Sequence, residues 1–401
     1  MKIMSFGHMP AWAGGRQESG LANVIYQLAK HGSEVNGAEV TLVATDSFVP
    51  ERKDGKLTIL GWTKNRLTVY ILIHPFRAVS SILKLCELKK KYPFRERFAG
   101  LYMKRIFFEK TINLINPQVI HLHGYDALWY VDLVPNDVKI TVTFHGMNGL
   151  DKKIPQHEIL FNMERDVFHS ERLSEVFFIS SQLVTSFKGA YGDNGKRNRV
   201  IFNSYDKSKF YYEEKMCVPA RFGENRNITT LCTVASLSDL KGQLRVLTAL
   251  NMLSGNKRFR YFCIGEGSEE MTAKLTAYAN ENDIDFSYLG KMNPDDIRKH
   301  LYSADYMIMP SSSEGFGLAY LEAIACGVPV ILPKGLPIAQ EKELINGKNS
   351  ILLDDCSDKS IAKVLGRIDE YVFNHQDVAS TISGLSWDDV ARQYYMAFKE
   401  M

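Results

Sequence analysis

The stretch from Pro310 to Pro333 constrains the fold of this chain more than any other part of its sequence. It reads PSSSEGFGLAYLEAIACGVPVILP, with an apolar run at 305–309 before it and a second at 328–332. Short apolar runs of this kind are typical of buried strands, so we expect a strand, a loop, a helix and a strand in succession. Cys326-Gly327 then places a glycine just past the predicted helix, where helices commonly end. The pattern predicts a unit of a doubly wound α/β sheet.

The loop inside this unit has the residues of a phosphate site. Gly315 and Gly317, on either side of Phe316, let a ligand approach the backbone because no Cβ is in the way. A helix that begins near Gly317 presents free N–H groups and a positive dipole end, and both favour phosphate. Glu322 lies about one turn inside this helix and can accept hydrogen bonds from the vicinal diol of a ribose. Glu314, in the loop, would face whatever lies beyond the phosphates.

Two glutamates separated by seven residues, with Gly-Phe-Gly between them, resemble the nucleotide-sugar signature of the retaining glycosyltransferases of family 4. The resemblance is firm from Thr229 to Pro333 and looser before it. It implies an α/β fold with two doubly wound Rossmann-like domains facing a central cleft, the arrangement called GT-B. The predicted domains are 1–205, to which 380–401 returns as a final helix, and 206–379. The first would bind mainly the acceptor and the second mainly the nucleotide sugar.

Further residues take roles from the same resemblance. Gly14 and Gly15, in a loop that lacks the Gly-x-Gly-x-x-Gly of a dinucleotide site, would approach the donor diphosphate. His145 follows a strand in Thr143-Phe144-His145-Gly146 and would border the transferred sugar, with a purely structural histidine as the alternative interpretation. The catalytic candidates are Glu314, His145 and Lys241. The donor-binding candidates are Gly14, Gly15, Lys241, Gly265, Gly267, Lys291, Gly315, Phe316, Gly317 and Glu322.

The implied mechanism is retaining and has no covalent nucleophile. The acceptor hydroxyl attacks from the side that the diphosphate leaves, and a phosphate oxygen takes its proton. Lys241 and the helix start near Gly317 would stabilise the diphosphate, so we expect no metal and no other cofactor. One departure is that Ala235-Ser236-Leu237 stands where the family usually has Gly-Arg-Leu. The second cation is therefore missing from its expected position, and Arg16 and Arg245 are the candidates to replace it.

The resemblance leaves the substrates and two other functions open. A UDP-sugar is favoured over a GDP-sugar as donor. The acceptor would be a glycan, a lipid-linked molecule or another hydroxyl compound, in the synthesis of surface polysaccharide or glycoconjugates. A non-catalytic homologue that assists a true transferase would keep the fold and lose the site. A nucleotide-sugar 2-epimerase would also have two such domains.

The net charge, the cysteines and the apolar runs limit which partners and which cellular location we expect for the chain. Its net charge is +3, which is too small to argue for nucleic acid. Six cysteines without a Cys-x-x-Cys pair, several of them in apolar runs, predict reduced and buried thiols. The sequence enters a strand at once and has no apolar run of the ~20 residues that a membrane span needs, so we expect a cytoplasmic protein.

The segment 84–110 is basic and aromatic, with nine Lys and Arg against three Glu, a net charge of +6. Two interpretations stay open. One is a pair of amphipathic helices with solvated basic faces. The other is a surface that meets anionic lipid at the inner face of a membrane, or a phosphorylated acceptor. The second interpretation predicts that changing Lys89, Lys90 and Lys91 to glutamate abolishes binding to anionic lipid.

Overall fold

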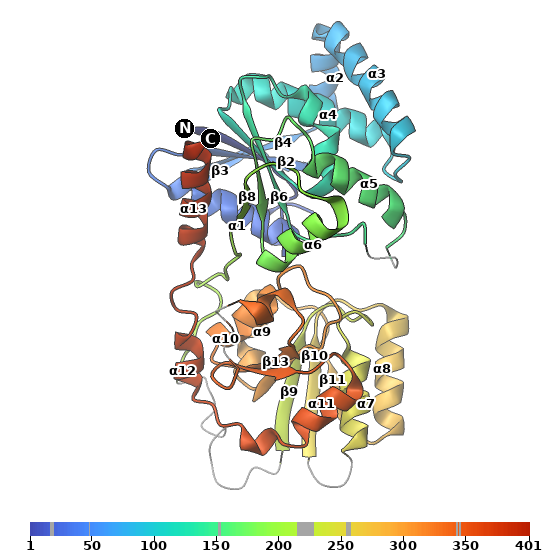
Figure 1. Cartoon of the computed structure of the whole chain (residues 1–401), viewed down its shortest axis with the longest axis vertical. Coiled ribbons are helices and arrows are strands. Elements are labelled where there is room, and N and C mark those ends of the chain that lie inside the picture. Colours follow the sequence, from blue (N-terminus) through green and yellow to red (C-terminus); the bar gives the residue numbers. More distant parts are fainter. Residues whose placement is uncertain are drawn as a thin grey trace. The chain divides into compact units, whose positions relative to one another are not determined.

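The computed structural model describes residues 1–16, 20–47, 49–150, 154–214, 228–253, 258–341, 344 and 346–401 (Figure 1). The chain divides into two compact units. The first comprises Met1–Asn203 and Trp387–Met401, and the second comprises Ser204–Ser386. The divisions therefore fall two residues before the predicted boundary at 205 and seven after the predicted one at 379. The charged sequence of 212–227 predicts a linker between the two domains, and most of it lies outside the described residues.

The first unit is built around a mostly parallel sheet with the strand order β3-β4-β2-β1-β5-β6-β7-β8, in which β3 alone is antiparallel to its neighbour. Its strands are β1 (Lys2–Gly7), β2 (Glu39–Ser47), β3 (Arg52–Asp54), β4 (Leu57–Trp62), β5 (Val119–His123), β6 (Lys139–Phe144), β7 (Glu175–Phe178) and β8 (Asn198–Val200). Its α-helices are α1 (Gly20–Glu34), α2 (Lys64–Ile73), α3 (Pro75–Lys91), α4 (Phe98–Ile115), α5 (His157–Phe168), α6 (Ser181–Tyr191) and α13 (Trp387–Glu400).

The second unit has a fully parallel sheet among the described residues, in the order β11-β10-β9-β12-β13-β14. Its strands are β9 (Ile228–Val234), β10 (Arg258–Ile264), β11 (Asp285–Tyr288), β12 (Tyr306–Ile308), β13 (Val330–Pro333) and β14 (Ser350–Leu353). Its α-helices are α7 (Gln243–Met252), α8 (Glu269–Glu281), α9 (Pro294–Leu301), α10 (Leu318–Ala325), α11 (Asp358–Leu365) and α12 (His375–Ser380).

Both sheets follow from the apolar runs in the sequence. Every residue of β5, β7, β12 and β13 is buried, as expected for parallel strands covered on both faces by crossover helices. The predicted succession of strand, loop, helix and strand around 305–333 is present as β12, α10 and β13. The predicted fold class, two doubly wound Rossmann-like domains, is confirmed. Ligands of such folds bind at the carboxyl ends of the strands. The candidate residues lie there, after β1, β6, β9, β10, β11 and β12.

The last helix, α13, packs within the first unit although the preceding chain belongs to the second (Figure 1). The Tyr394 ring lies against Phe177, with 4.9 Å between ring centroids, and its hydroxyl is 3.1 Å from Oγ1 of Thr143. At the end of the helix, Glu400 accepts hydrogen bonds from Arg197 and Arg199, each at 2.8 Å. The helix therefore completes the core and an ion-pair cluster of the first unit.

The basic segment 84–110 forms the end of α3 and most of α4, but it does not present one cationic face. The guanidinium of Arg105 is fully buried and binds both carboxylate oxygens of Asp132, at 2.8 and 2.7 Å. Lys89 donates to the backbone carbonyls of Phe94 and Glu96. Arg105 therefore belongs neither to a solvated basic face nor to a surface that could meet lipid. A buried cation needs a partner that compensates its charge, and Asp132 does so for Arg105.

Two further expectations meet the structure here. Cys232, Cys263 and Cys326 are free and buried as predicted, but Cys86 is exposed and Cys356 is half-buried, so burial is not general among the described cysteines. Cys217 lies outside the described residues. Within the described part of the chain, no single helix has both the length and the apolar character to cross a membrane. Only the helices 67–73 and 75–91 taken together, at a bend of 108°, have the required length and composition.

Candidate functional site

The carboxyl edge of the second sheet brings Lys241 and Glu314 together. Lys241 follows β9 and Glu314 follows β12, so 73 residues separate them along the chain. Nζ of Lys241 donates to Oε1 of Glu314 at 2.6 Å, and the hydroxyl of Ser311 donates to the same oxygen at 2.7 Å. The side chains are 20% and 8% exposed, respectively. The carboxylate therefore holds a positioned ammonium group at the edge where parallel sheets bind ligands.

Arg245, from α7, fastens the two loops that carry this pair. Its guanidinium donates to the carbonyl oxygen of Pro310 at 2.7 Å and to that of Asp239 at 2.9 Å. Gly242 allows the close approach, because it has a φ of +82° and a Cβ there would lie 2.8 Å from the Pro310 oxygen. Arg245 thus binds backbone carbonyls on both loops, and we assign it to the structure of the site. Ser236 is exposed.

Helix α10 begins next to Glu314 with its N-terminus open. Gly317 is the N-cap, with a φ of +95°, and no side chain caps this end of the helix. A Cβ at Gly317 would lie 2.6 Å from Cδ2 of Tyr320, whose hydroxyl donates to the carbonyl of Met309 at 2.7 Å. Free N–H groups and the dipole favour an anion at such a helix start. Phe316 is buried, so of this predicted donor-binding residue only the backbone can meet a ligand.

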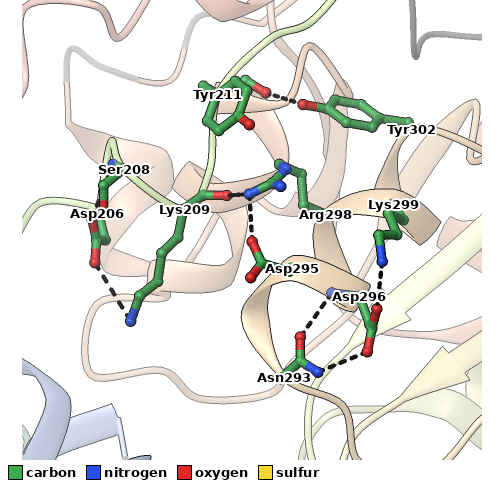
Figure 2. A network of polar contacts seen from close by, with 10 residues as sticks. All are labelled: Asp206, Ser208, Lys209, Tyr211, Asn293, Asp295, Asp296, Arg298, Lys299 and Tyr302. Atoms are coloured by element: carbon green, nitrogen blue, oxygen red, sulfur yellow. Dashed lines mark hydrogen bonds and ion pairs between the residues drawn. The ribbon is translucent and has the colours of Figure 1, made fainter. Parts of the chain in front are cut away.

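Glu322, in α10, lies in the field of Asp206 and Lys209. Burial and the Asp206 carboxylate together raise the pKa of Glu322 to about 7, although Lys209 opposes this. Lys209 forms an ion pair with Asp206 at 3.7 Å, and Asp206 also accepts hydrogen bonds from the backbone N–H and the hydroxyl of Ser208 (Figure 2). A carboxyl group with this pKa is balanced between its neutral and charged forms at neutral pH. Its capacity to accept two hydrogen bonds from a diol therefore depends on pH.

The segment that carries Asp206 and Lys209 is fastened to α9. Arg298 donates to the carbonyl oxygen of Lys209 and to Asp295, and the hydroxyl of Tyr302 donates to the carbonyl of Tyr211 (Figure 2). The Arg298 guanidinium also lies 4.5 Å from the centre of the Tyr211 ring. These contacts fix the two charges that act on Glu322.

Gly265 and Gly267 bring three strand ends close together. A Cβ at Gly265 would lie 2.0 Å from the carbonyl oxygen of Ala235, and one at Gly267 would lie 2.6 Å from Cδ1 of Leu237. The N–H of Gly265 donates to the carbonyl of Gly290 at 2.9 Å. Both glycines were predicted to approach a nucleotide, and the contacts within the chain already require them. Lys291, the next predicted donor-binding residue, is exposed directly after Gly290.

In the first unit, His145 belongs to a row of histidines at the ends of β5 and β6. Its Nε2 is 3.1 Å from Nδ1 of His123, whose ring lies 4.4 Å from that of His121. Burial lowers the pKa of His145 and of His121 to about 3, and that of His123 well below its ordinary value. All three rings are therefore neutral at physiological pH. Such rings can donate or accept hydrogen bonds, but they do not serve as imidazolium acids.

Glu164, from α5, holds the loop that follows His145. Its buried carboxylate accepts hydrogen bonds from the N–H groups of Asn148 and Gly149, at 2.8 and 3.0 Å, and from the hydroxyl of Tyr191 at 2.9 Å. These bonds satisfy a carboxylate that burial would otherwise penalise. Glu164 is thus a positioning residue for the His145 loop.

A small pocket opens at the ends of β1 and β5 in the same unit. Its polar lining consists of His8, Thr45, Glu96, Lys104, His123 and Asp126. Nε2 of His123 is buried and has no hydrogen-bond partner. Burial, reinforced by the Glu96 carboxylate, raises the pKa of Asp126 to about 6. Asp126 and His8 were not predicted as site residues, although both follow parallel strands at the edge where ligands bind.

The Gly14-Gly15 turn is shaped by neighbours in its own unit. Gly14 has a φ of +83°, and a Cβ there would lie 3.2 Å from the guanidinium of Arg52, which donates to the carbonyl of Ala13. A Cβ at Gly15 would lie 1.9 Å from the carbonyl oxygen of Met9. Both glycines are therefore required by the turn. Arg52, a cation beside this turn, was also not predicted as a site residue.

Comparison with known proteins assigns the chain to a family. Residues 19–209 match the model of Glycosyltransferase Family 4, and residues 219–370 match that of Glycosyl transferases group 1. The chain belongs to this family of GT-B glycosyltransferases. The predicted membership is thereby confirmed across both units.

The curated relatives are distant glycosyltransferases. N-acetyl-alpha-D-glucosaminyl L-malate synthase from Bacillus anthracis is 22% identical over 60% of this chain and 61% of its own length. An uncharacterised glycosyltransferase from Methanocaldococcus jannaschii is 27% identical over 77% of this chain and 78% of its own. This chain spans between 22% and 61% of the length of the first five curated relatives that it matches.

Solved glycosyltransferase structures have the same fold over the full length. Sucrose-phosphate synthase from Thermosynechococcus elongatus has a TM-score of 0.75 and 14% identity, covering 100% of this chain and 99% of its own. HepE from Anabaena, in complex with UDP and glucose, has a TM-score of 0.69 and 14% identity over 100% of both chains. Sequence identities of 14% show that this chain shares the fold of these two enzymes, and they do not show that it shares their substrates.

Proposed function

We propose that the chain is a retaining glycosyltransferase that moves a sugar from a nucleotide sugar, with UDP favoured as the nucleotide, to an acceptor hydroxyl without a metal ion. The observation that carries the proposal is the ion pair of Lys241 and Glu314 beside the open N-terminus of α10. Cation, helix start and carboxylate are the groups that a leaving diphosphate and a sugar need. The prediction of metal independence rests on the first two of these.

In the proposed reaction the acceptor oxygen forms a bond to the anomeric carbon on the face from which the diphosphate leaves. The bond between that carbon and the phosphate oxygen breaks, and the acceptor proton passes to the departing phosphate. Lys241 and the first N–H groups of α10 stabilise the growing negative charge. Glu314 orients Lys241 through the 2.6 Å contact and faces the sugar. Glu322 binds the ribose diol.

The pocket at the ends of β1 and β5 is the proposed place for the acceptor. Lys104 and Glu96 form an ion pair at 2.5 Å beside it, and Asp126 and the unpartnered Nε2 of His123 line it. Hydrogen-bonding groups of both kinds suit a polyhydroxylated molecule. His145 lies next to His123 and, being neutral, contributes polar contacts to the sugar and not a proton.

The nucleotide is the finer part of the proposal. HepE from Anabaena is described in complex with UDP, whereas a mannosyltransferase from Corynebacterium glutamicum, 27% identical over 38% of this chain, is GDP-mannose-dependent. Titration calorimetry with UDP, GDP and ADP is expected to give the tightest binding for UDP, by about tenfold or more, which corresponds to ~1.4 kcal/mol. Tighter binding of GDP would overturn the choice of UDP and leave the transferase proposal in place.

The same preparation separates the transferase from its two alternatives. A retaining transferase converts the UDP-sugar to UDP and places the sugar on an added polyol or glycan with the anomeric configuration of the donor, which NMR reads directly. A 2-epimerase would yield a sugar inverted at C2, and a non-catalytic homologue would bind UDP without turnover. Either of these results, or a product of inverted anomeric configuration, would contradict the proposal.

A further inference from the structure

Helices α2 and α3 expose an unusual amount of apolar surface. Among the described residues, seven of the seventeen large apolar side chains that are exposed lie between positions 69 and 83. We call this set the apolar corner: Val69, Leu72, Ile73, Phe76, Val79, Ile82 and Leu83. Phe76 is 90% exposed and Leu72 75%. A patch of this kind on one helix pair is typical of a surface that meets a partner or a membrane.

The backbone concentrates these side chains at one tip of the first unit. Helix α2 ends at Ile73 and α3 begins at Pro75, with an angle of 108° between the helices (Figure 1). The opposite face of α3 is used inside the unit, because Ala78, Ser81 and Leu85 are buried there. The exposed face has the helical spacing of Phe76, Val79 and Leu83, so it is a continuous apolar stripe. Packing within the unit accounts for only one face of the helix.

The charge beside the corner is mostly positive, although Arg77, Lys84 and Lys91 form ion pairs with Glu109, Glu87 and Asp166, respectively. Residues 64–91 contain seven Lys and Arg and one Glu, a net charge of +6, while the whole chain has +3. The side chains of Arg77 and Lys91 are 51% and 64% exposed. Lys90 is exposed as well, and it lies about two turns beyond Leu83 on the same face of α3. Along α3 the exposed stripe therefore changes from apolar at its start to cationic at its end.

We propose that the apolar corner inserts into the surface of an anionic lipid bilayer, with the cations of α3 at the level of the headgroups. Apolar side chains next to Lys and Arg are the pattern of interfacial helices, in which apolar burial and attraction to anionic lipid add. The proposed membrane-binding surface is therefore formed by α2 and α3, and not by the whole segment 84–110 that the sequence indicated. It goes beyond the transfer reaction and does not depend on it.

Charge decides between a bilayer and a second copy of the chain. A symmetric dimer through the corner would bring two surfaces with an excess of positive charge together, even after Glu109 and Asp166 pair with Arg77 and Lys91, and like charges at an interface oppose association. An anionic lipid surface is apolar below and negative at its face, which complements the corner and the cations together. A bilayer is thus the occupant that both features fit.

Co-sedimentation with vesicles tests the proposal on the full chain. The protein is expected to bind vesicles made of equal parts phosphatidylcholine and phosphatidylglycerol, to bind pure phosphatidylcholine far less, and to dissociate as NaCl approaches ~1 M, where screening acts over about 3 Å. Two double variants test the two features of the surface. Leu72→Ser with Phe76→Ser removes apolar side chains, and Lys84→Glu with Lys90→Glu reverses charges. Each double variant should bind the anionic vesicles roughly tenfold or more weakly than the wild type. Matched controls in the second unit are Val372→Ser, 78% exposed, and Lys348→Glu with Lys359→Glu.

A depth measurement separates insertion from surface attraction. Phe76→Trp should add a fluorescence signal that brominated lipids quench, whereas Val372→Trp should add one that they do not. Unchanged thermal unfolding and UDP binding in all variants would show that the units are intact. Absence of binding to anionic vesicles, binding that the corner variants do not weaken, or loss of a dimer in size-exclusion chromatography of those variants would each overturn the proposal.

Discussion

Replacement of Lys241 by alanine is expected to lower the turnover of the nucleotide sugar by about two to three orders of magnitude. The reason is that Lys241 is the cation that Glu314 positions at this edge of the sheet. Ser236 stands where the resemblance to the family predicts an arginine, and Arg245 binds the carbonyls of Pro310 and Asp239. The substitution also leaves Glu314, 8% exposed, without the ammonium that it contacts at 2.6 Å. The measurement is steady-state release of UDP from the donor.

Lys241→Arg should retain part of this activity, because charge at a single contact matters more than shape. In the double variant Lys241→Ala with Glu314→Gln, the loss of turnover should not exceed the product of the losses in the two single variants. The reason is that Glu314→Gln removes the carboxylate that Lys241→Ala leaves unpaired. Lys359→Ala, an exposed lysine of α11, is the matched control. Wild-type turnover in Lys241→Ala would remove this loop from the site.

The residues of this site differ in how far the sequence predicts them. The order of strand, loop and helix around Glu314 is local, and the apolar runs with Gly315, Gly317 and Gly327 are enough to predict it. The contact of Lys241 with Glu314 joins two loops 73 residues apart, and only a resemblance to a family placed both in one site. The sequence has no local signal for such a distance.

Tertiary contacts explain what the sequence does not predict. Arg105 looks like every other cation in its basic segment, and only the fold gives it Asp132 as a buried partner. Gly265 and Gly267 are predicted to approach a nucleotide, and the close approach of Ala235 and Leu237 is a second reason for glycine at both positions that the sequence does not show. The apolar corner was missed for a related reason. An amphipathic period reveals that a helix has an apolar stripe, and α3 has apolar residues on both the buried and the exposed face.

Glu322→Gln is expected to weaken UDP binding by about ten- to a hundredfold at pH 8 and only slightly at pH 5.5. With a pKa of about 7, Glu322 is a carboxylate at pH 8 and a neutral acid at pH 5.5, where the wild type has already lost one acceptor for the ribose diol. Calorimetry across this range measures the difference. UDP itself titrates, so the curve of Glu322→Gln supplies the baseline.

Stability should change in the opposite direction. The pKa of Glu322 is raised from 4.5 to about 7 in the folded chain. The folded state therefore prefers the protonated form, and the stability that this preference provides is fully present below pH 4.5 and is lost as the pH rises through 7. Glu322→Gln removes that loss. At pH 8 the free energy of unfolding of the variant should therefore exceed that of the wild type by ~1–3 kcal/mol, and its unfolding temperature should be higher. At pH 4.5 the two should agree.

Asp206→Asn tests the origin of the effect without touching α10. Removing the Asp206 charge should lower the pKa of Glu322 and extend tight UDP binding to lower pH, since Asp206 raises that pKa. The Asp354→Asn variant, an exposed carboxylate paired with Lys334 and Lys363 elsewhere in the unit, should leave the profile unchanged. A fold damaged by substitution loses stability and affinity together, whereas a carboxylate held for its ligand at a cost to the fold loses affinity and gains stability. UDP affinity that does not change with pH relative to Glu322→Gln would place the diol elsewhere.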